Sequence, residues 1–313
     1  MQEKKTHSLA TQIHEAYERI RSSIVQTPLL DVSGLLPDHS VRLLFKMENL
    51  QHTGSFKLRG ATNKVLLLTA EQASKGVIAA SNGNHGIAVA LAAHKKGIAA
   101  EVYVSTHVSA VKAKRIEQHG AIIRRVGTDP LEAEMAARAA AMQADKVFIS
   151  PYNDVEVVAG QGTIAVELQR QQPAVDVIFV SVGGGGLIGG IGAYQKMVSP
   201  GTEIVGCWPE NSPVMFECMK AGRIIDVPER PTLSESTAGG LEAGSVTLDI
   251  CKTVIDRSVL VTEEEIAAAM RTVYAQREWT IEGAAGVAVA AFSKEAEKYR
   301  GKTVVVIICG GKQ

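Results

Sequence analysis

The chain alternates short runs of β-branched residues with longer stretches of helical periodicity, and this alternation limits its possible folds more than any other feature. Strands are expected at 43–47, 77–80, 101–104, 122–126, 147–149, 177–182, 203–207, 259–261 and 303–308. Helical patterns lie between most of them, at 87–94, 109–119, 130–144, 163–170, 187–197 and 263–277. Several strands are apolar almost throughout, which is typical of strands covered on both faces. The alternation predicts an α/β fold with parallel sheets and right-handed crossovers.

Length and charge limit the class of protein. A chain of 313 residues predicts roughly two domains, and no repeat or low-complexity linker marks a break between them. Lysine plus arginine and aspartate plus glutamate each number 33. This balance gives no electrostatic reason to expect a nucleic-acid or membrane partner.

The cysteines and the N-terminal segment indicate the compartment. The four cysteines form no CxxC pair and no zinc-type spacing, which favours a reducing environment over a disulfide framework. The N-terminal segment is charged and lacks the apolar core of a signal peptide. The longest stretch of small apolar residues, 283–292, is too short to span a bilayer. We therefore expect a cytoplasmic protein.

The segment 53–61 reads Thr-Gly-Ser-Phe-Lys-Leu-Arg-Gly-Ala, and its lysine, Lys57, follows a glycine turn and opens a predicted helix. A free lysine has a pKa of about 10.4, and its amine becomes nucleophilic where burial or nearby positive charge lowers that value. Phe56 and Leu58 offer an apolar wall, and Arg59 offers a cationic neighbour. Taken alone, the segment is more typical of a surface lysine on a helix.

The segment 81–86, Ser-Asn-Gly-Asn-His-Gly, lies between an expected strand and an expected helix. Ligands of open α/β sheets bind at the carboxyl ends of strands. Hydroxyl, amide and imidazole groups, together with free N–H groups at a helix start, suit a carboxylate. The alternative is a polar turn whose side chains only cap the helix.

Four consecutive glycines, Gly183 to Gly186, follow a buried strand. Their N–H groups can approach phosphate oxygens closely, and the following helix adds its positive end. A permissive tight turn is one alternative. A dinucleotide site is another, because Gly184, Gly186 and Gly189 satisfy GxGxxG and Glu210 follows about 20 residues later. No Walker-type lysine follows the glycines, which argues against an NTPase.

The strand expected at 303–308 ends in Cys309, Gly310 and Gly311. A small side chain at that point can face a planar ring, and a thiol is a weak hydrogen-bond donor or acceptor. The alternative is an ordinary buried cysteine at a strand end.

Taken in this order and spacing, the four segments resemble those of the fold-type II pyridoxal-phosphate enzymes, in particular the serine/threonine dehydratases (ammonia-lyases) and serine racemases. The likeness covers nearly the whole chain and includes the segments 48–51, 159–163 and 282–286. It implies a tryptophan synthase β-like fold with two domains, each an open, mostly parallel twisted sheet flanked by helices.

The resemblance also implies a division of the chain. Residues 1–75 and 149–313 would form the large cofactor-binding domain, and residues 76–148 the small mobile domain. Closure of the small domain over the substrate would exclude water. Enzymes that resemble this chain are commonly dimers, so we expect a homodimer.

The resemblance assigns roles to the matching residues. Lys57 would form a Schiff base with pyridoxal 5'-phosphate, Asn84 would bond the pyridoxal hydroxyl, and Cys309 would face the pyridine nitrogen. The other residues expected to line the cofactor are Phe56, Tyr152, Gly183, Gly184, Gly185, Gly186, Leu187 through its N–H, and Glu282. Those expected at the substrate are Ser81, Asn82, Gly83 and His85, which would grip the carboxylate, and Gly240.

The implied activity is conversion of a β-hydroxy-α-amino acid to a 2-oxo acid and ammonia. The freed Lys57 amine would remove the α-proton while the conjugated cofactor takes up the charge. The β-hydroxyl would then depart. A neutral Cys309 cannot protonate the ring nitrogen as an aspartate would, which favours elimination over transamination. Serine, threonine or a bulkier 3-hydroxy amino acid are the expected substrates.

Two departures from the family pattern narrow the expectation. Racemases that resemble this chain carry a second Ser after the first in the loop, and Asn82 stands in that place, so efficient racemisation is not expected. Metal-binding members carry acids where this chain has Trp208 and Val214, so no metal site is expected. The alternatives left open are a racemase or β-replacement synthase of the same fold, and an NAD-dependent oxidoreductase.

Overall fold

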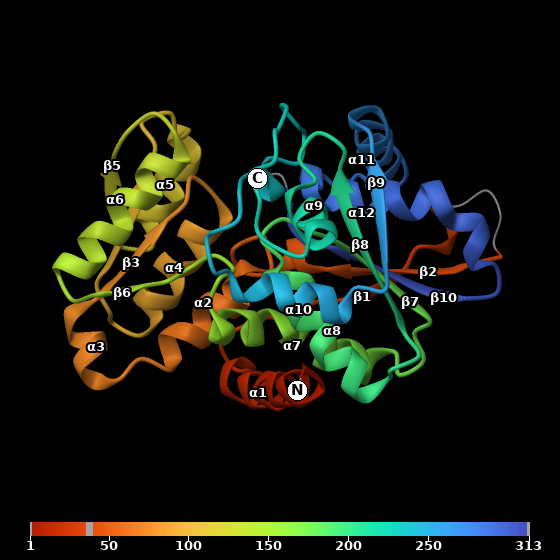
Figure 1. Cartoon of the computed structure of the whole chain (residues 1–313), viewed down its shortest axis with the longest axis horizontal. Helices are drawn as coiled ribbons and strands as arrows, with labels where there is room; N and C mark the ends of the chain where they lie inside the picture. The colour runs from red at the N-terminus through yellow and green to blue at the C-terminus, as the bar shows by residue number, and fades with distance from the viewer. Residues whose placement is uncertain (1, 36–39, 312–313) are drawn as a thin grey trace.

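The computed structural model describes residues 2–35 and 40–311, which form two twisted sheets flanked by helices (Figure 1). The strands are β1 (Leu29–Asp31), β2 (Arg42–Met47), β3 (Val77–Ala80), β4 (Ala100–Val104), β5 (Ile122–Arg125), β6 (Val147–Phe148), β7 (Val177–Ser181), β8 (Glu203–Pro209), β9 (Arg257–Val261) and β10 (Thr303–Ile308).

The α-helices are α1 (Gln2–Ile20), α2 (Lys57–Leu66), α3 (Ala70–Lys75), α4 (Asn84–Lys95), α5 (Ala110–Gln118), α6 (Pro130–Gln143), α7 (Val155–Gln171), α8 (Gly186–Val198), α9 (Val214–Ala221), α10 (Val246–Val254), α11 (Glu263–Arg277) and α12 (Gly283–Glu295). Short 3-10 helices are η1 (Ser33–Leu35), η2 (Glu48–Leu50), η3 (Glu235–Thr237) and η4 (Ala296–Tyr299).

The strand order confirms the expected mostly parallel α/β fold. The larger sheet has the order β1-β2-β10-β7-β8-β9, and its pairs are parallel except for β1 with β2. The smaller sheet has the order β5-β4-β3-β6 and is parallel throughout. The smaller sheet falls within the range expected for a small domain, and the boundaries at 76 and 148 stay a prediction.

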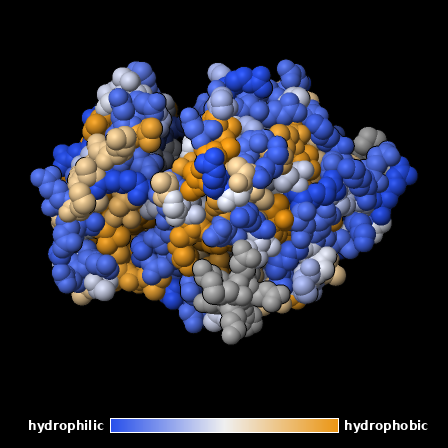
Figure 2. Space-filling model, viewed as in Figure 1, coloured by the Kyte–Doolittle hydropathy of each residue, from blue (hydrophilic) through white to orange (hydrophobic). Residues whose placement is uncertain are grey.

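Helices cover both faces of the larger sheet. α8 packs against β7 and β8 and is backed by α1 and α7, while α12 packs against β7 to β10 with α11 outside it (Figure 1). α2 contacts both α7 and α4, so it lies where the two sheet units meet. The surface is hollowed between these two parts of the molecule (Figure 2).

The expected strands are confirmed within a few residues, and so are most of the expected helices. The elements that were not among those expected are β1, α1, α3, α9, α10 and α12. α4 and α7 begin earlier than the pattern indicates, at Asn84 and Val155. Asn84 and His85 therefore belong to the first turn of a helix and not to a loop. The segment 159–163 lies inside α7, where its glycines weaken the helical pattern but allow close packing. A capping box at Thr262 begins α11, as Glu265 three residues later indicates.

Within the described ranges, no helix is both long enough and apolar enough to cross a bilayer.

The contact between α2 and α7 depends on paired glycines. A Cβ on Gly160 would lie 2.6 Å from Gly60 Cα and 2.7 Å from the Arg59 carbonyl oxygen. Both are backbone atoms, so a side chain at 160 can be accommodated only by moving the two helices apart.

We expect Gly160→Ala to lower the free energy of unfolding by about 1–3 kcal/mol, because overpacking against rigid backbone separates the helices. Urea unfolding followed by circular dichroism measures this. Gly201→Ala is the matched control, since a Cβ there meets no atom within 4 Å. Equal stability of the two variants would contradict the close approach.

Candidate active site

Lys57 is the first residue of α2, and its amine makes contacts within the protein. Its Nζ atom donates a hydrogen bond to the Pro151 carbonyl at 2.9 Å and lies 5.1 Å from the centre of the Phe56 ring. The Phe56 N–H donates to the Cys309 carbonyl at 3.0 Å. The Lys57 side chain therefore lies between the segment at Pro151 and the end of β10.

Burial lowers the pKa of Lys57 from its ordinary value of 10.5 to about 8, although nearby Glu282 acts in the opposite direction. A substantial fraction of this amine is therefore neutral in mildly alkaline solution, which makes it nucleophilic. The expectation that Arg59 acts as a cationic neighbour of Lys57 is wrong. The Arg59 guanidinium is directed away to two carboxylates, and burial alone lowers the lysine pKa.

Arg59 belongs to a cluster of four buried charges behind Lys57. Its Nε donates to Glu48 Oε2 at 2.7 Å and its Nη1 to Glu167 Oε1 at 2.7 Å. Lys46 Nζ donates to the other Glu167 oxygen at 2.6 Å. The four side chains are at most 1% exposed. Despite burial, the two carboxylates raise the pKa of Arg59, so its charge is fixed.

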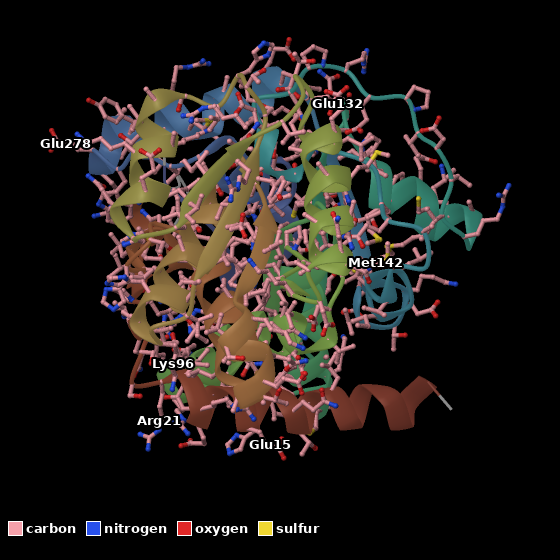
Figure 3. The ribbon with its side chains drawn as sticks, turned by 90° about the vertical axis from the view of Figure 1, so that its left-hand side faces the viewer. Glu15, Arg21, Lys96, Glu132, Met142 and Glu278 are labelled. Atoms are coloured by element: carbon pink, nitrogen blue, oxygen red, sulfur yellow. The ribbon has the colours of Figure 1, made fainter. Side chains whose placement is uncertain are left out.

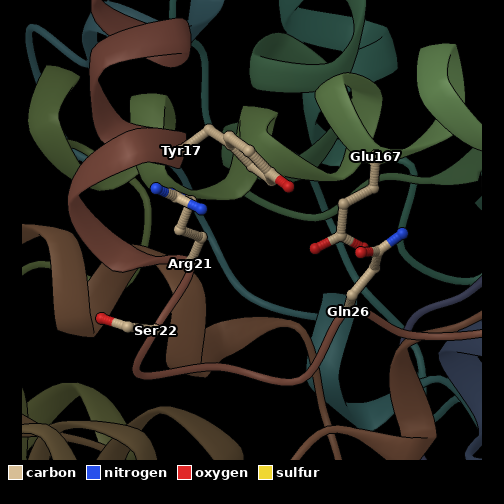
Figure 4. A pocket seen from close by; sticks show the side chains of 5 residues that line it. All are labelled: Tyr17, Arg21, Ser22, Gln26 and Glu167. Carbon is tan, nitrogen blue, oxygen red and sulfur yellow. The ribbon is translucent and has the colours of Figure 1, made fainter.

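A cavity of about 190 Å³ lies against this cluster and away from Lys57. It is lined by Tyr17, Arg21, Ser22, Gln26 and Glu167, and Figure 4 shows the Tyr17 hydroxyl and the Glu167 carboxylate facing the same space. None of these residues was expected at the active site. The cavity is polar and borders Glu167 from the α1 side, so it adds nothing to the chemistry at the amine.

Two consecutive residues, Pro151 and Tyr152, connect the lysine to the glycine turn. Pro151 accepts the Lys57 hydrogen bond, and the ring of the next residue, Tyr152, covers the turn. A Cβ on Gly184 would lie 2.3 Å from Tyr152 Cγ, so only glycine fits beneath the ring. Gly185 has a φ of +83°, which favours glycine, and α8 begins at the following residue. Gly185 also has no side chain with which to cap the first N–H groups of α8.

A buried carboxyl joins two of the expected site residues. Glu282 Oε2 accepts a hydrogen bond from Asn84 Nδ2 at 2.9 Å, and the Cys309 thiol donates to Glu282 Oε1 at 3.3 Å. The Ser181 hydroxyl donates to Cys309 Sγ at 3.5 Å. Burial raises the pKa of Glu282, and burial raises the pKa of the Cys309 thiol well above its ordinary value. Cys309 is therefore a neutral thiol.

The side chains of the 81–85 segment are largely occupied within the protein. The Asn82 amide donates to the Ser105 hydroxyl at 2.8 Å and accepts from the Ser105 N–H at 2.8 Å. The Ser81 hydroxyl accepts from the Gly83 N–H at 3.1 Å. His85 is buried, with Nε2 2.8 Å from the Ile149 carbonyl.

The His85 imidazole is neutral. Burial, with a smaller effect of Lys57, lowers its pKa to about 3. Since Nε2 faces a carbonyl oxygen, this nitrogen carries the proton, and Nδ1 is a buried acceptor without a hydrogen-bond partner in the described part of the chain.

Gly240 is the expected residue that the structure does not bring against the others. It is exposed, in a loop before α10, and a Cβ there would meet nothing within 4 Å. Its loop neighbour Glu242 does reach the site, because the Glu242 N–H donates to the Tyr152 hydroxyl at 2.9 Å. Sequence patterns gave no signal for Glu242. For the charge cluster one signal existed: Lys46 interrupts an apolar strand and therefore needs a buried partner.

Comparison with known proteins identifies the family. The model of the pyridoxal-phosphate dependent enzymes matches residues 20–310. The chain belongs to this family. The expected recognition and cofactor are thereby confirmed, and the oxidoreductase alternative receives no support.

Relatives and solved structures agree with the family match. The chain is 38% identical to an L-threonine ammonia-lyase of Thermotoga maritima over 96% of its own length and 74% of that protein. It is 34% identical to a serine racemase of Arabidopsis thaliana, covering 96% of the chain and 91% of the relative. A solved threonine deaminase of Solanum lycopersicum matches with a TM-score of 0.93 and 30% identity, covering 99% of this chain and 85% of that one.

The residues present fit the family cofactor, which combines an aldehyde, a pyridine ring and a phosphate. The aldehyde requires an amine that can lose its proton, and Lys57 has a lowered pKa. The phosphate requires backbone N–H groups that no side chain caps, and the start of α8 has no side-chain cap. The ring requires polar groups at its edge, which Asn84, Glu282 and Cys309 supply.

In residues 2–35 and 40–311 no group of three or more His, Cys, Asp or Glu could hold a metal ion.

We expect Arg59→Met to lower the free energy of unfolding by about 3–5 kcal/mol, because Glu48 and Glu167 would remain buried with less positive charge beside them. Urea unfolding measures this loss. Lys298→Met is the control, since its pair with Glu295 is solvent-exposed on the lysine side. A surface pair of this kind is worth about 0–1 kcal/mol. A comparably small loss for Arg59→Met would show that the cluster is not needed for the fold.

Proposed function

We propose that this chain is an ammonia-lyase (dehydratase) that uses pyridoxal phosphate to convert a β-hydroxy-α-amino acid into a 2-oxo acid and ammonia. The observation that carries the proposal is a buried amine with a lowered pKa, Lys57, beside a glycine turn and a neutral thiol. The similarity to threonine ammonia-lyases supports serine or threonine as the substrate class.

We assign the cofactor contacts as follows. Lys57 Nζ would bond to the aldehyde carbon, with Phe56 beside the ring. Gly183 to Gly186 and the Leu187 N–H would bind the phosphate, beneath the Tyr152 ring. Asn84 would bond the ring hydroxyl, and Cys309 would face the ring nitrogen, both next to Glu282. When bound, the cofactor supplies an electron sink for the charge that develops at the substrate α-carbon.

The chain's own residues would then bind the substrate and move its proton. The substrate carboxylate would lie at the start of α4, where backbone N–H groups and the helix dipole favour an anion. Ser81, Asn82 and Gly83 border this position. Because the Asn82 side-chain amide is hydrogen-bonded to Ser105, the backbone N–H of Asn82 is the better donor to the substrate carboxylate. His85 would act by holding the first turn of α4 to Ile149 and not by gripping the substrate with its ring.

Lys57 Nζ would be released from the cofactor aldehyde carbon when the substrate binds. As a free amine, it would then take the α-proton. A neutral Cys309 leaves the ring nitrogen without a strong acid, which favours departure of the β-hydroxyl over slower competing reactions. We further propose that residues 76–148 move as a small domain that closes over the substrate against residues 1–75 and 149–313. Closure would exclude water while the negative charge exists.

A racemase is the second candidate, because similar proteins include serine racemases. Inversion requires a second acid–base group on the face opposite Lys57. The Asn82 amide cannot serve as that acid or base near neutral pH, and both of its polar atoms are bonded to Ser105. This arrangement favours elimination as the main reaction.

We also propose a cytoplasmic homodimer without nucleic-acid or membrane partners. The balanced charge supports the absence of such partners, and four buried free thiols at Cys207, Cys218, Cys251 and Cys309 suit a reducing compartment. The homodimer is proposed only from the resemblance to enzymes that are commonly dimers.

The test is a panel of 3-hydroxy amino acids, in both stereochemical series, incubated with the holoenzyme and followed by NMR. We expect 2-oxo acid and ammonia in equal amounts from at least one member. Lys57→Ala should lower kcat/KM by about 10³-fold or more, because it removes the base. Borohydride should fix the cofactor to Lys57 in the unmodified protein. Inversion of an amino acid without oxo-acid release would overturn the lyase assignment.

The pH dependence of cofactor binding follows from the Lys57 pKa. The neutral amine reacts with the aldehyde, and its pKa is about 8, so the association rate should rise with pH up to about pH 8 and level off above it. Stopped-flow absorbance of the cofactor-free protein mixed with pyridoxal phosphate, above about pH 6.5 where the phosphate is ionised, measures this. Nα-acetyl-lysine is the reference, and its rate should rise through about pH 10. A protein profile that follows the reference would contradict the effect of burial.

A further inference from the structure

Side chains from both sheet units converge on one carboxylate, that of Glu242, through one ion pair and two hydrogen bonds. Arg138 Nη2 lies 2.6 Å from Glu242 Oε1, and Asn153 Nδ2 donates to Glu242 Oε2 at 2.7 Å. The Ser150 hydroxyl donates to Oε1 at 3.3 Å. Arg138 is on α6, which covers the smaller sheet, whereas Glu242 is in the loop before α10 of the larger unit. In Figure 3, Glu132 and Met142 mark the two ends of α6, and Arg138 lies between them in sequence.

The Arg138 guanidinium is also held in place by contacts with residues other than Glu242. It lies 4.3 Å from the centre of the Phe148 ring, and its Nη2 is 2.9 Å from Glu134 on the same helix. Arg138 therefore shares its charge between a carboxylate of its own helix and a carboxylate of the other unit. A guanidinium that is stacked and paired in this way loses little freedom when it forms a further ion pair.

Glu242 is also joined to the glycine turn. Its N–H donates to the Tyr152 hydroxyl at 2.9 Å, and the Tyr152 ring covers Gly184. Asn153 fixes the same loop a second time, because its Oδ1 accepts from the Val246 N–H at 3.0 Å. A continuous series of contacts thus leads from α6, through Glu242 and Tyr152, to the turn that we assign to the phosphate.

We infer that Glu242 is a positioning residue that couples the placement of α6 over the cleft to the Tyr152 ring above the phosphate turn. With Arg138 in place, the small unit is held against the loop 238–245 and the ring is held over the glycines. When the ion pair opens, both restraints weaken together, so cofactor retention and cleft closure change in parallel. The inference rests on the proposed cofactor site and on the proposed closure of residues 76–148.

The size of the effect follows from exposure. Arg138 and Glu242 are 39% and 19% exposed, and a pair of this kind contributes modestly. We therefore expect a change of about two- to five-fold in an equilibrium or rate from loss of the Arg138 partner alone. Salt should weaken the pair, because partly exposed charges are screened.

The experiment measures release of pyridoxal phosphate from the holoenzyme by dilution and visible absorbance, which requires no substrate. We expect Arg138→Met and Glu242→Gln each to speed release by about two- to five-fold. The double variant should release no faster than the faster single variant, because both remove one interaction. Arg138→Lys should restore part of the loss. In the unmodified enzyme, release should accelerate between about 0.05 and 0.5 M NaCl, and in the double variant it should not.

Glu134→Gln is the matched control, since it removes the other carboxylate beside Arg138 without touching the larger unit. It should not speed release. Equal acceleration by Glu134→Gln, or additive effects of the two single variants, would overturn the inference. Hydrogen exchange of residues 238–246 in the unmodified holoenzyme gives a second readout: exchange should increase with salt, and an unchanged rate would also overturn it. Failure of the proposed function would appear separately, as an unmodified protein that retains no pyridoxal phosphate.

Discussion

The position of Lys57 depends on the charges buried behind it. Arg59 lies one half-turn further along α2 and is bonded to Glu48 of η2 and to Glu167 of α7. Desolvation offsets much of the attraction in such a cluster, so its value is not mainly extra stability. Any other placement of α2 would leave a charge buried without its partner. The cluster therefore selects one orientation of the helix, and with it one direction for the lysine side chain.

Much of the fold could be predicted because buried strands require runs of apolar, β-branched residues, which are visible in the sequence. Runs of β-branched residues located nearly every strand, and the capping box at Thr262 located the start of α11. β1 was missed because three residues carry no periodicity. The start of α7 was missed for a tertiary reason. Gly160 disfavours a helix locally but permits α2 to approach, and no local pattern reports a neighbour that is distant in sequence.

The candidate site divides in the same way. The Lys57 segment and the glycine turn each left alternatives open when taken alone, and their order and spacing together suggested the family; their roles in the site stay a prediction. The burial that lowers the lysine pKa, the hydrogen bond to Pro151 and the contacts of Glu242 could not be predicted, since each joins segments far apart in the chain. Arg59 shows the limit most clearly: its proximity in sequence suggested one partner, and the fold gave it two others.

The place of α2 between the two sheet units has a consequence for motion. α2 packs on α7 on one side and on α4 on the other. In the closure that we propose for residues 76–148, α2 would stay with the larger unit, because it belongs to residues 1–75 and packs on α7. The start of α4, including Asn84, would move relative to it. Lys57 Nζ would therefore keep its position while the space in front of it widens to admit substrate and release product.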